Sequence, residues 1–142
     1  MSFHPYLAFA GNCREAFTRY QEIFGGEAVL LTAADVPPDE SMEMPADKAE
    51  FIIHAALVAG DQLLMGADDP GGGFDGQNRG MCCNFSVDEL AEAERVFAAL
   101  SEGGAVQMPL TPTFFSPGFG MCIDRFGTPW MVVTNDPTAS MP

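Results

Sequence analysis

The chain has little positive charge. Six lysines and arginines stand against 20 acidic residues in a chain of 142, which gives a formal net charge of -14, and Lys48 is the one lysine. So few cations cannot form the basic patch that attracts phosphate groups. We therefore expect neither nucleic acid nor an anionic membrane as a partner, and we assign the acidity to a solvated surface.

Long apolar runs are also missing. No stretch approaches the roughly 20 apolar residues that cross a bilayer as a helix. The opening MSFHPYLAF lacks a basic segment followed by an apolar one. We therefore expect no signal peptide and a cytoplasmic location.

Cysteines are few, and several common site motifs are absent. Cys13, Cys82, Cys83 and Cys122 include no CxxC pair, which favours reduced thiols over a disulfide framework or a zinc site. The aspartates at 66–80 do not have EF-hand spacing, and the sequence contains no Gly-x-Ser-x-Gly. Nor does a Gly-rich turn join a buried strand to a helix, as in the doubly wound sheets that bind large cofactors.

One stretch of the sequence occurs twice. EAFTRYQEIFGGEAV, at 15–29, aligns without a gap with EAERVFAALSEGGAV, at 92–106, at a single offset of 77 residues. In both copies the apolar residues recur with helical spacing and glycine follows them. Each copy therefore predicts an amphipathic helix that ends before a strand, and the chain contains two copies of one unit.

Hydrophobic periodicity predicts the order β-α-β-β-β in each half. The first half has a strand at 3–10, a helix at 13–24 capped by Asn12, and strands at 28–33, 50–59 and 62–65; the second has a strand at 81–87, a helix at 89–100 capped by Asp88, and strands at 105–108, 120–124 and 129–134. Residues 35–49 form a loop long enough to be a lid or an arm, and residues after Asn135 a frayed tail. We expect one domain over 1–142, built of module 1 (1–66) and module 2 (80–135) with a flexible Gly/Asp-rich linker (67–79).

Four motifs together resemble the PhnB-like family: YLAFAGNCREAFTRYQEIFGG, IIHAALVAGDQLLMGAD, GGAVQMPLTPTFF and FGMCIDRFGTPWMV. This family is also described as 3-demethylubiquinone-9 3-methyltransferase-like, and it is a branch of the vicinal-oxygen-chelate superfamily. The resemblance extends from Tyr6 to Val133. It implies an α+β fold of two tandem βαβββ modules, the glyoxalase/bleomycin-resistance/dioxygenase-like fold. It also implies helices outside, curved sheets that form cups, and a homodimer.

The resemblance also supplies four positions at which metal enzymes of the superfamily hold their ion. They correspond to Pro5, His54, Cys82 and Met131. Proline has no side-chain donor, and methionine is a poor ligand for hard divalent ions. We therefore expect no metal cofactor, with a divalent ion as the alternative. His4 faces the cup only if the first strand slips by one residue.

Strand alternation from these positions predicts an apolar inner face with a few polar groups, which suits a mostly apolar small molecule. The predicted pocket residues are Leu7, Ile52, His54, Cys82, Asn84, Ser86, Phe114, Phe115 and Met131. A structural alternative exists for several of them, because a lone histidine can be a core residue and phenylalanines more often pack than clamp a ligand. Trp130 is assigned to the core, and Asp124 with Arg125 to a structural pair at a turn.

Three functions are compatible with the sequence, and whether the chain is an enzyme stays open. The favoured one is a PhnB-like protein that binds a mostly apolar small molecule in a β-cup without a catalytic metal. The alternative is a glyoxalase-like, metal-dependent lyase or dioxygenase that uses His54 with Cys82 or His4. The third is an interaction module whose cup is filled by its own side chains.

Overall fold

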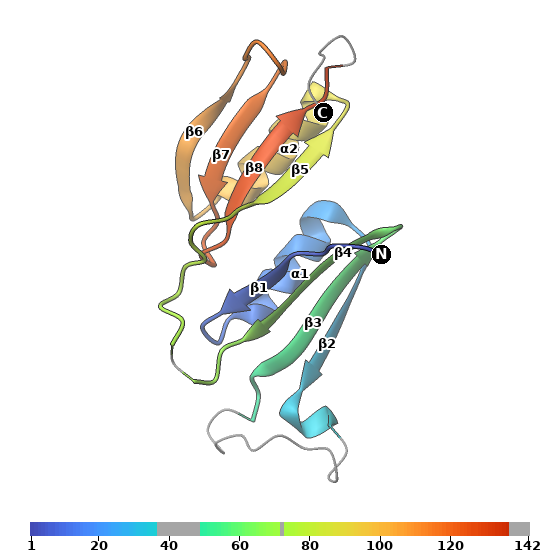
Figure 1. Ribbon diagram of the computed structural model, residues 1–142, viewed down its shortest axis with the longest axis vertical. Helices are drawn as coiled ribbons and strands as arrows, with labels where there is room; N and C mark the ends of the chain where they lie inside the picture. Colours follow the sequence, from blue (N-terminus) through green and yellow to red (C-terminus); the bar gives the residue numbers. More distant parts are fainter. Residues whose placement is uncertain (37–48, 72, 137–142) are drawn as a thin grey trace. The chain divides into compact units, whose positions relative to one another are not determined.

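The computed structural model describes residues 1–36, 49–71 and 73–136 and divides into two compact units, Met1–Gln77 and Asn78–Pro142. In each unit one helix covers one face of a four-stranded sheet (Figure 1). Most of the predicted lid or arm at 35–49, and the tail from residue 137 on, lie outside the described residues. No helix in the described part of the chain has the length and apolar character needed to cross a membrane.

Unit 1 contains β1 (Tyr6–Phe9), α1 (Cys13–Phe24), β2 (Glu27–Thr32), the short 3-10 helix η1 (Ala33–Asp35), β3 (Ile52–Ala59) and β4 (Gln62–Asp68). The strand order is β1-β4-β3-β2, and β1 runs parallel to β4 while the other pairs are antiparallel. The first strand of the unit is therefore joined to its last strand.

Unit 2 repeats this topology with β5 (Cys83–Val87), α2 (Leu90–Ser101), β6 (Ala105–Thr111), β7 (Phe119–Ile123) and β8 (Pro129–Thr134). The strand order is β5-β8-β7-β6, again with only the first pair parallel. The predicted α+β fold of two βαβββ modules is confirmed. Strand β1 begins three residues later than predicted, and β6 continues past Pro109 to Thr111.

The core of unit 1 lies between α1 and its sheet. Phe17 of α1 meets Phe9 of β1 edge to face at 5.9 Å between ring centroids, and Tyr20 meets Phe17 at 5.6 Å. All three side chains are fully buried. Burial of each such side chain contributes about 1.5–3 kcal/mol. Gly66 of β4 lies beneath these rings, because a Cβ there would come within 3.0 Å of Phe17.

A buried aspartate, Asp68, begins α1 instead of the predicted cap Asn12. The Asn12 side chain makes no capping bond. Asp68 Oδ1 accepts the backbone N–H groups of Gly11 and Cys13 at 2.9 and 3.0 Å, and Oδ2 accepts that of Ile52 at 2.8 Å. One carboxylate thus joins the end of β1, the start of α1 and the start of β3. The predicted linker begins three residues too early on this side, because β4 continues to Asp68.

A second buried aspartate, Asp124, shapes the turn between β7 and β8. Its Oδ1 accepts the backbone N–H groups of Phe126 and Thr128 at 2.9 and 3.0 Å, and its Oδ2 accepts the indole N–H of Trp130 at 2.9 Å. Arg125, the predicted partner of Asp124, instead lies over the Phe126 ring at 4.8 Å. Trp130 is buried, in line with its predicted place in the core.

Helix α2 begins differently from the prediction. Its N-cap is Glu89, which makes no side-chain capping bond, while the predicted cap Asp88 accepts the side-chain amide of Asn135 at 2.9 Å. The α2 N-terminus therefore has no counterpart of the carboxylate that caps α1.

Candidate functional site

The sheet of unit 1 has an open face, which is the side away from α1. Because Phe9, Gly66 and Phe17 lie together on the helix side, the residues that alternate with them on each strand point to the open face. Cross-strand pairing places these residues there: Tyr6, Ala8, Val29, Leu31, His54, Ala56, Val58, Leu63, Met65 and Ala67. The face is thus almost entirely apolar.

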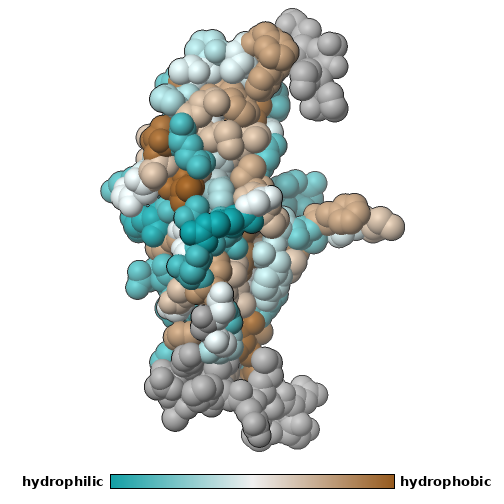
Figure 2. All heavy atoms as spheres, turned by 60° about the vertical axis from the view of Figure 1, so that its left-hand side comes forward, coloured by the Kyte–Doolittle hydropathy of each residue, from teal (hydrophilic) through white to brown (hydrophobic). Residues whose placement is uncertain are grey.

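Much of this apolar surface is accessible. Tyr6 is 50% exposed, Val29 48%, Val58 42% and Leu31 40%. Figure 2 shows that apolar atoms also reach the surface elsewhere on the molecule, interleaved with polar ones. Large exposed apolar side chains gathered on one sheet face are typical of a binding surface.

Tyr6 and His54 form the polar centre of the open face of unit 1. The Tyr6 hydroxyl lies 3.1 Å from His54 Nδ1, and the two rings are 5.8 Å apart. Partial desolvation, and to a smaller degree the Cys13 thiol, raises the pKa of Tyr6, so the phenol keeps its proton at neutral pH. In the tautomer in which Tyr6 donates to Nδ1, the other ring nitrogen, Nε2, carries hydrogen and can donate to a ligand.

The bonds of Asp68 help to place this pair. They fix the end of β1, which carries Tyr6, and the start of β3, which carries His54. The bonded residues Gly11 and Ile52 are 57 and 16 residues from Asp68 in the chain. Asp68 therefore holds the two strands in the register that brings the phenol to the imidazole.

The open face of unit 2 follows the same plan. Gly120 faces the helix, because a Cβ there would lie 2.9 Å from Phe97, so Phe119 and Met121 point the other way. Pairing adds these residues to the face: Asn84, Ser86, Pro129, Met131 and Val133. Its polar pair is Asn84 and Ser86, whose side chains are joined by a 3.0 Å hydrogen bond from Asn84 Nδ2 to Ser86 Oγ. Phe115 contacts Phe119 edge to face at 5.1 Å and extends the apolar surface.

The structure places several predicted pocket residues on these open faces: His54 in unit 1, and Asn84, Ser86 and Met131 in unit 2. Phe115 lies beside the unit 2 face, whereas Phe114 contacts only its edge through Phe115 and is 90% exposed. Cys82 precedes β5 and is partly exposed.

Leu7 and Ile52 lie elsewhere. Leu7 is 4% exposed and shares the helix side of β1 with Phe9, and Ile52 is fully buried. Two causes account for this. Pro5 precedes β1 and the true phase points Tyr6 to the open face, and an irregularity between Leu31 and Thr32 interrupts the alternation where β2 pairs with β3. Tyr6, Met65 and Met121 were missed for the same reasons of phase and strand assignment.

The four positions that match the superfamily's metal ligands do not fit a divalent ion. His54 lies on the third strand of its unit, β3, and Met131 on the fourth, β8, so the two are not equivalent. The residue of unit 1 that pairs with the first strand as Met131 does is Met65, again a thioether. Within 1–36, 49–71 and 73–136, no three His, Cys, Asp or Glu residues gather closely enough to hold a metal. Thioethers are poor donors for hard divalent ions.

Three of the four thiols are unsuited to nucleophilic chemistry. Cys13, Cys83 and Cys122 are buried, and desolvation raises the pKa of each, to about 12 for Cys83. The thiolate is the reactive form, so these residues are inert packing groups.

Comparison with known proteins gives one family. The family model described as 3-demethylubiquinone-9 3-methyltransferase matches residues 1–133. Protein YjdN of Escherichia coli is 32% identical over 148 residues, covering 97% of this chain and 99% of that protein. Among solved structures, protein PA1353 of Pseudomonas aeruginosa is 45% identical with a TM-score of 0.85, covering 95% of this chain and 98% of that one.

More distant structures have the same fold. The PhnB protein of Bacillus cereus is 24% identical with a TM-score of 0.72, over 94% of this chain and 99% of that one. A glyoxalase/bleomycin resistance/dioxygenase family enzyme of Burkholderia phytofirmans is 12% identical with a TM-score of 0.62, over 92% and 95%. At these identities the likeness concerns the fold alone.

Proposed function

The chain belongs to the 3-demethylubiquinone-9 3-methyltransferase family, whose PhnB-like members have the glyoxalase/bleomycin-resistance/dioxygenase fold, and from this we propose that it binds a mostly apolar small molecule on the open faces of its sheets without a catalytic metal. The family description names a methyl transfer. Both sheets are mixed, with one parallel pair each, and so differ from the doubly wound parallel sheet that often binds large cofactors. The described residues therefore do not form such a cleft.

The observation that carries the proposal is the composition of the two open faces. Each is apolar across several strands and contains one hydrogen-bonded polar pair, Tyr6 with His54 in unit 1 and Asn84 with Ser86 in unit 2. Ligand sites are typically apolar with a small number of placed polar groups that fix orientation. We assign the ligand one or two polar atoms on an otherwise apolar body, with an acceptor oxygen directed at His54.

The test is a thermal-shift screen of apolar ligands that carry a carbonyl, a carboxylate or a phenol. A ligand that prefers the native state raises the melting temperature. Each hit is then titrated into His54→Ala and Tyr6→Phe. Loss of one hydrogen bond weakens binding by about fivefold.

The chain offers a matched control, because its only other histidine, His4, is exposed and precedes β1. His4→Ala leaves the affinity unchanged if the ligand contacts His54. Equal losses in His4→Ala and His54→Ala, or no hit across all three ligand classes, would contradict the proposal.

The metal-dependent alternative has a separate test. Untagged protein is incubated with Ni, Zn, Mn and Fe(II), desalted, and measured for metal content by mass spectrometry. Our proposal expects no ion near one per chain. A stoichiometric ion that is lost in His54→Ala would replace it with the lyase or dioxygenase function.

We further propose that two copies of the chain associate. The open faces expose Val29, Leu31 and Val58, and each sheet has two edge strands, so a second copy has apolar surface and strand edges to cover. Light scattering coupled to size exclusion gives the mass directly. A monomer across micromolar concentrations would refute the dimer but not ligand binding.

A further inference from the structure

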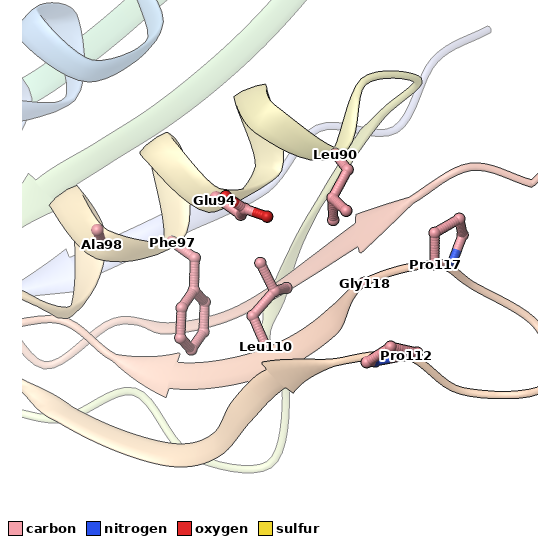
Figure 3. A pocket seen from close by; sticks show the side chains of 8 residues that line it. All are labelled: Leu90, Glu94, Phe97, Ala98, Leu110, Pro112, Pro117 and Gly118. Carbon is pink, nitrogen blue, oxygen red and sulfur yellow. The ribbon is translucent and has the colours of Figure 1, made fainter.

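Unit 2 contains a pocket that is separate from its open face. It lies on the helix side, between α2 and the hairpin of β6 and β7, and its volume is about 410 Å³. Figure 3 shows Leu90 and Phe97 projecting from α2 toward Leu110 of β6, with Glu94 between them along the helix. Pro112 and Pro117 close the side formed by the loop between β6 and β7. The volume lies within the range of small-molecule sites.

The internal repeat explains why this pocket exists. At the offset of 77 residues, Glu94 occupies the place of Phe17, and Phe97 that of Tyr20. In unit 1 Phe17 is fully buried and contacts both Phe9 and Tyr20. Unit 2 thus has a carboxylate where unit 1 has the ring that fills its helix–sheet interface.

The pocket's single charge is unpaired. Glu94 is the one charged residue of its lining, and among the described residues none forms an ion pair or a side-chain hydrogen bond with it. The neighbouring acid Glu92 differs, since Arg95 neutralises it. A free carboxylate on an apolar wall is complementary to a cation with an apolar body, and a net charge of -14 attracts cations to the protein as a whole.

A second polar group lies behind the apolar wall. Thr134 ends the pairing of β8 with β5 as Asp68 ends that of β4 with β1. Its hydroxyl is buried and has no hydrogen-bond partner. A Cβ on Gly118 would lie 3.2 Å from this hydroxyl and 2.6 Å from Leu90 Cδ1, so the hydroxyl adjoins the pocket where Gly118 lines it. A buried hydroxyl without a partner favours a ligand or a water that supplies one.

We infer that this pocket binds a small primary amine with an apolar body, whose ammonium group pairs with Glu94 while the body lies against Leu90, Phe97 and Leu110. The inference goes beyond the proposed function, because the pocket lies on the opposite side of the sheet from Asn84 and Ser86.

The test uses phenethylamine and phenethyl alcohol, which share an apolar body and differ in charge. Each is titrated into the full-length 15N-labelled protein, and amide shifts are followed by NMR. Saturable shifts are expected along α2 and at Gly118 with the amine, and binding about fivefold weaker with the alcohol, the upper end for an exposed ion pair. Equal affinity for the two probes, or no saturable shift at α2, would overturn the inference.

Variants then separate charge from shape. Glu94→Gln weakens the amine about fivefold and leaves the alcohol unchanged, while Glu94→Asp retains most of the preference. Glu94→Phe restores the residue found in unit 1, fills the pocket and abolishes binding of both probes. Glu102→Gln, the same change of charge at the far end of α2, is the control and binds the amine as the unchanged protein does. A loss in Glu102→Gln equal to that in Glu94→Gln would show a general charge effect and reject the site.

The same spectra distinguish this site from the proposed one. Shifts at Tyr6, His54, Asn84 or Ser86 in place of α2 would assign the amine to an open face and refute the inference. Binding at α2 with no ligand found for the open faces would support the inference and contradict the proposed function.

Discussion

The bond between Asp124 and Trp130 makes a sharp prediction about the stability of unit 2. The aspartate is 5% exposed, and its two oxygens accept three N–H groups. In Asp124→Asn, one oxygen can still accept the N–H groups of Phe126 and Thr128. The new amide then faces the indole N–H of Trp130, so that two donors oppose each other.

The magnitude follows from the bond that is lost. A hydrogen bond to a charged group is worth about 1.5–3 kcal/mol, and leaving a buried donor unsatisfied costs about 1–3 kcal/mol. We therefore expect Asp124→Asn to lower the free energy of unfolding by about 3 kcal/mol. Asp88→Asn is the control, because Asp88 is exposed and bonded to Asn135, and its effect stays within about 0.5 kcal/mol.

A double-mutant cycle with Trp130→Phe isolates the interaction. In the unchanged protein Trp130→Phe removes a favourable bond, whereas in Asp124→Asn it removes the opposed donors. The cost of Trp130→Phe should therefore be about 1.5–3 kcal/mol smaller in the Asp124→Asn background. Urea unfolding followed by far-UV circular dichroism measures all four proteins. A coupling energy below about 0.5 kcal/mol would refute the reasoning.

Four other predictions follow from buried groups. Asp68→Ala leaves three backbone N–H groups without an acceptor and should destabilise unit 1 by about 3–5 kcal/mol in urea unfolding; a loss below 1 kcal/mol would contradict it. Iodoacetamide should label Cys82 first in the native protein, as read by mass spectrometry, and faster labelling of Cys83 would be inconsistent with its burial. The pKa of Cys83 is about 12 in the folded chain, above its unfolded value, so its contribution to stability is complete below pH 8.5 and is lost as pH rises toward 12, by up to about 1.4 kcal/mol per pH unit; Cys83→Ala should flatten this decline, and an unaltered slope would argue against it. Gly26→Ala would overlap the carbonyl oxygen of Val58 at a φ of 84° and should cost at least about 2 kcal/mol, with an unchanged melting temperature as the contrary result.

The repeat and its periodicity were enough to predict the order of elements. Both helices recur at one offset, and glycine follows each, so the βαβββ order could be derived from local signals. Helix boundaries were accurate for α1 because Gly25 has a positive φ of 78° and ends it.

The open faces were predicted only in part, because alternation gives two possible phases for each strand. Around β1 both Tyr6 and Leu7 are apolar enough for either side, and the proline before them was taken as the anchor. The bonds that fix the true phase come from Asp68, far along the chain, and leave no local pattern. Asn84 and Ser86 were placed correctly because polar residues alternate with buried ones on β5.

The pocket beside Glu94 had a signal in the sequence that went unused. The two helices were aligned for their identities, whereas the site arises from a difference, a carboxylate in place of a buried ring. In duplicated proteins the positions at which the copies diverge deserve the same scrutiny as those at which they agree.

The pairing of first with last strand has a consequence for how the chain folds. Tyr6 pairs with Met65 and Cys83 with Trp130, so each sheet closes only after its hairpins exist, and this closure carries the largest loop-entropy cost. The place beside β4 and the place beside β8 are alike, and each can accept either initial strand. During synthesis β1 and β4 are both available before β5 emerges, which favours the native pairing. Refolding from denaturant removes that head start and exposes the duplicated sheets to strand exchange, within one chain or between two.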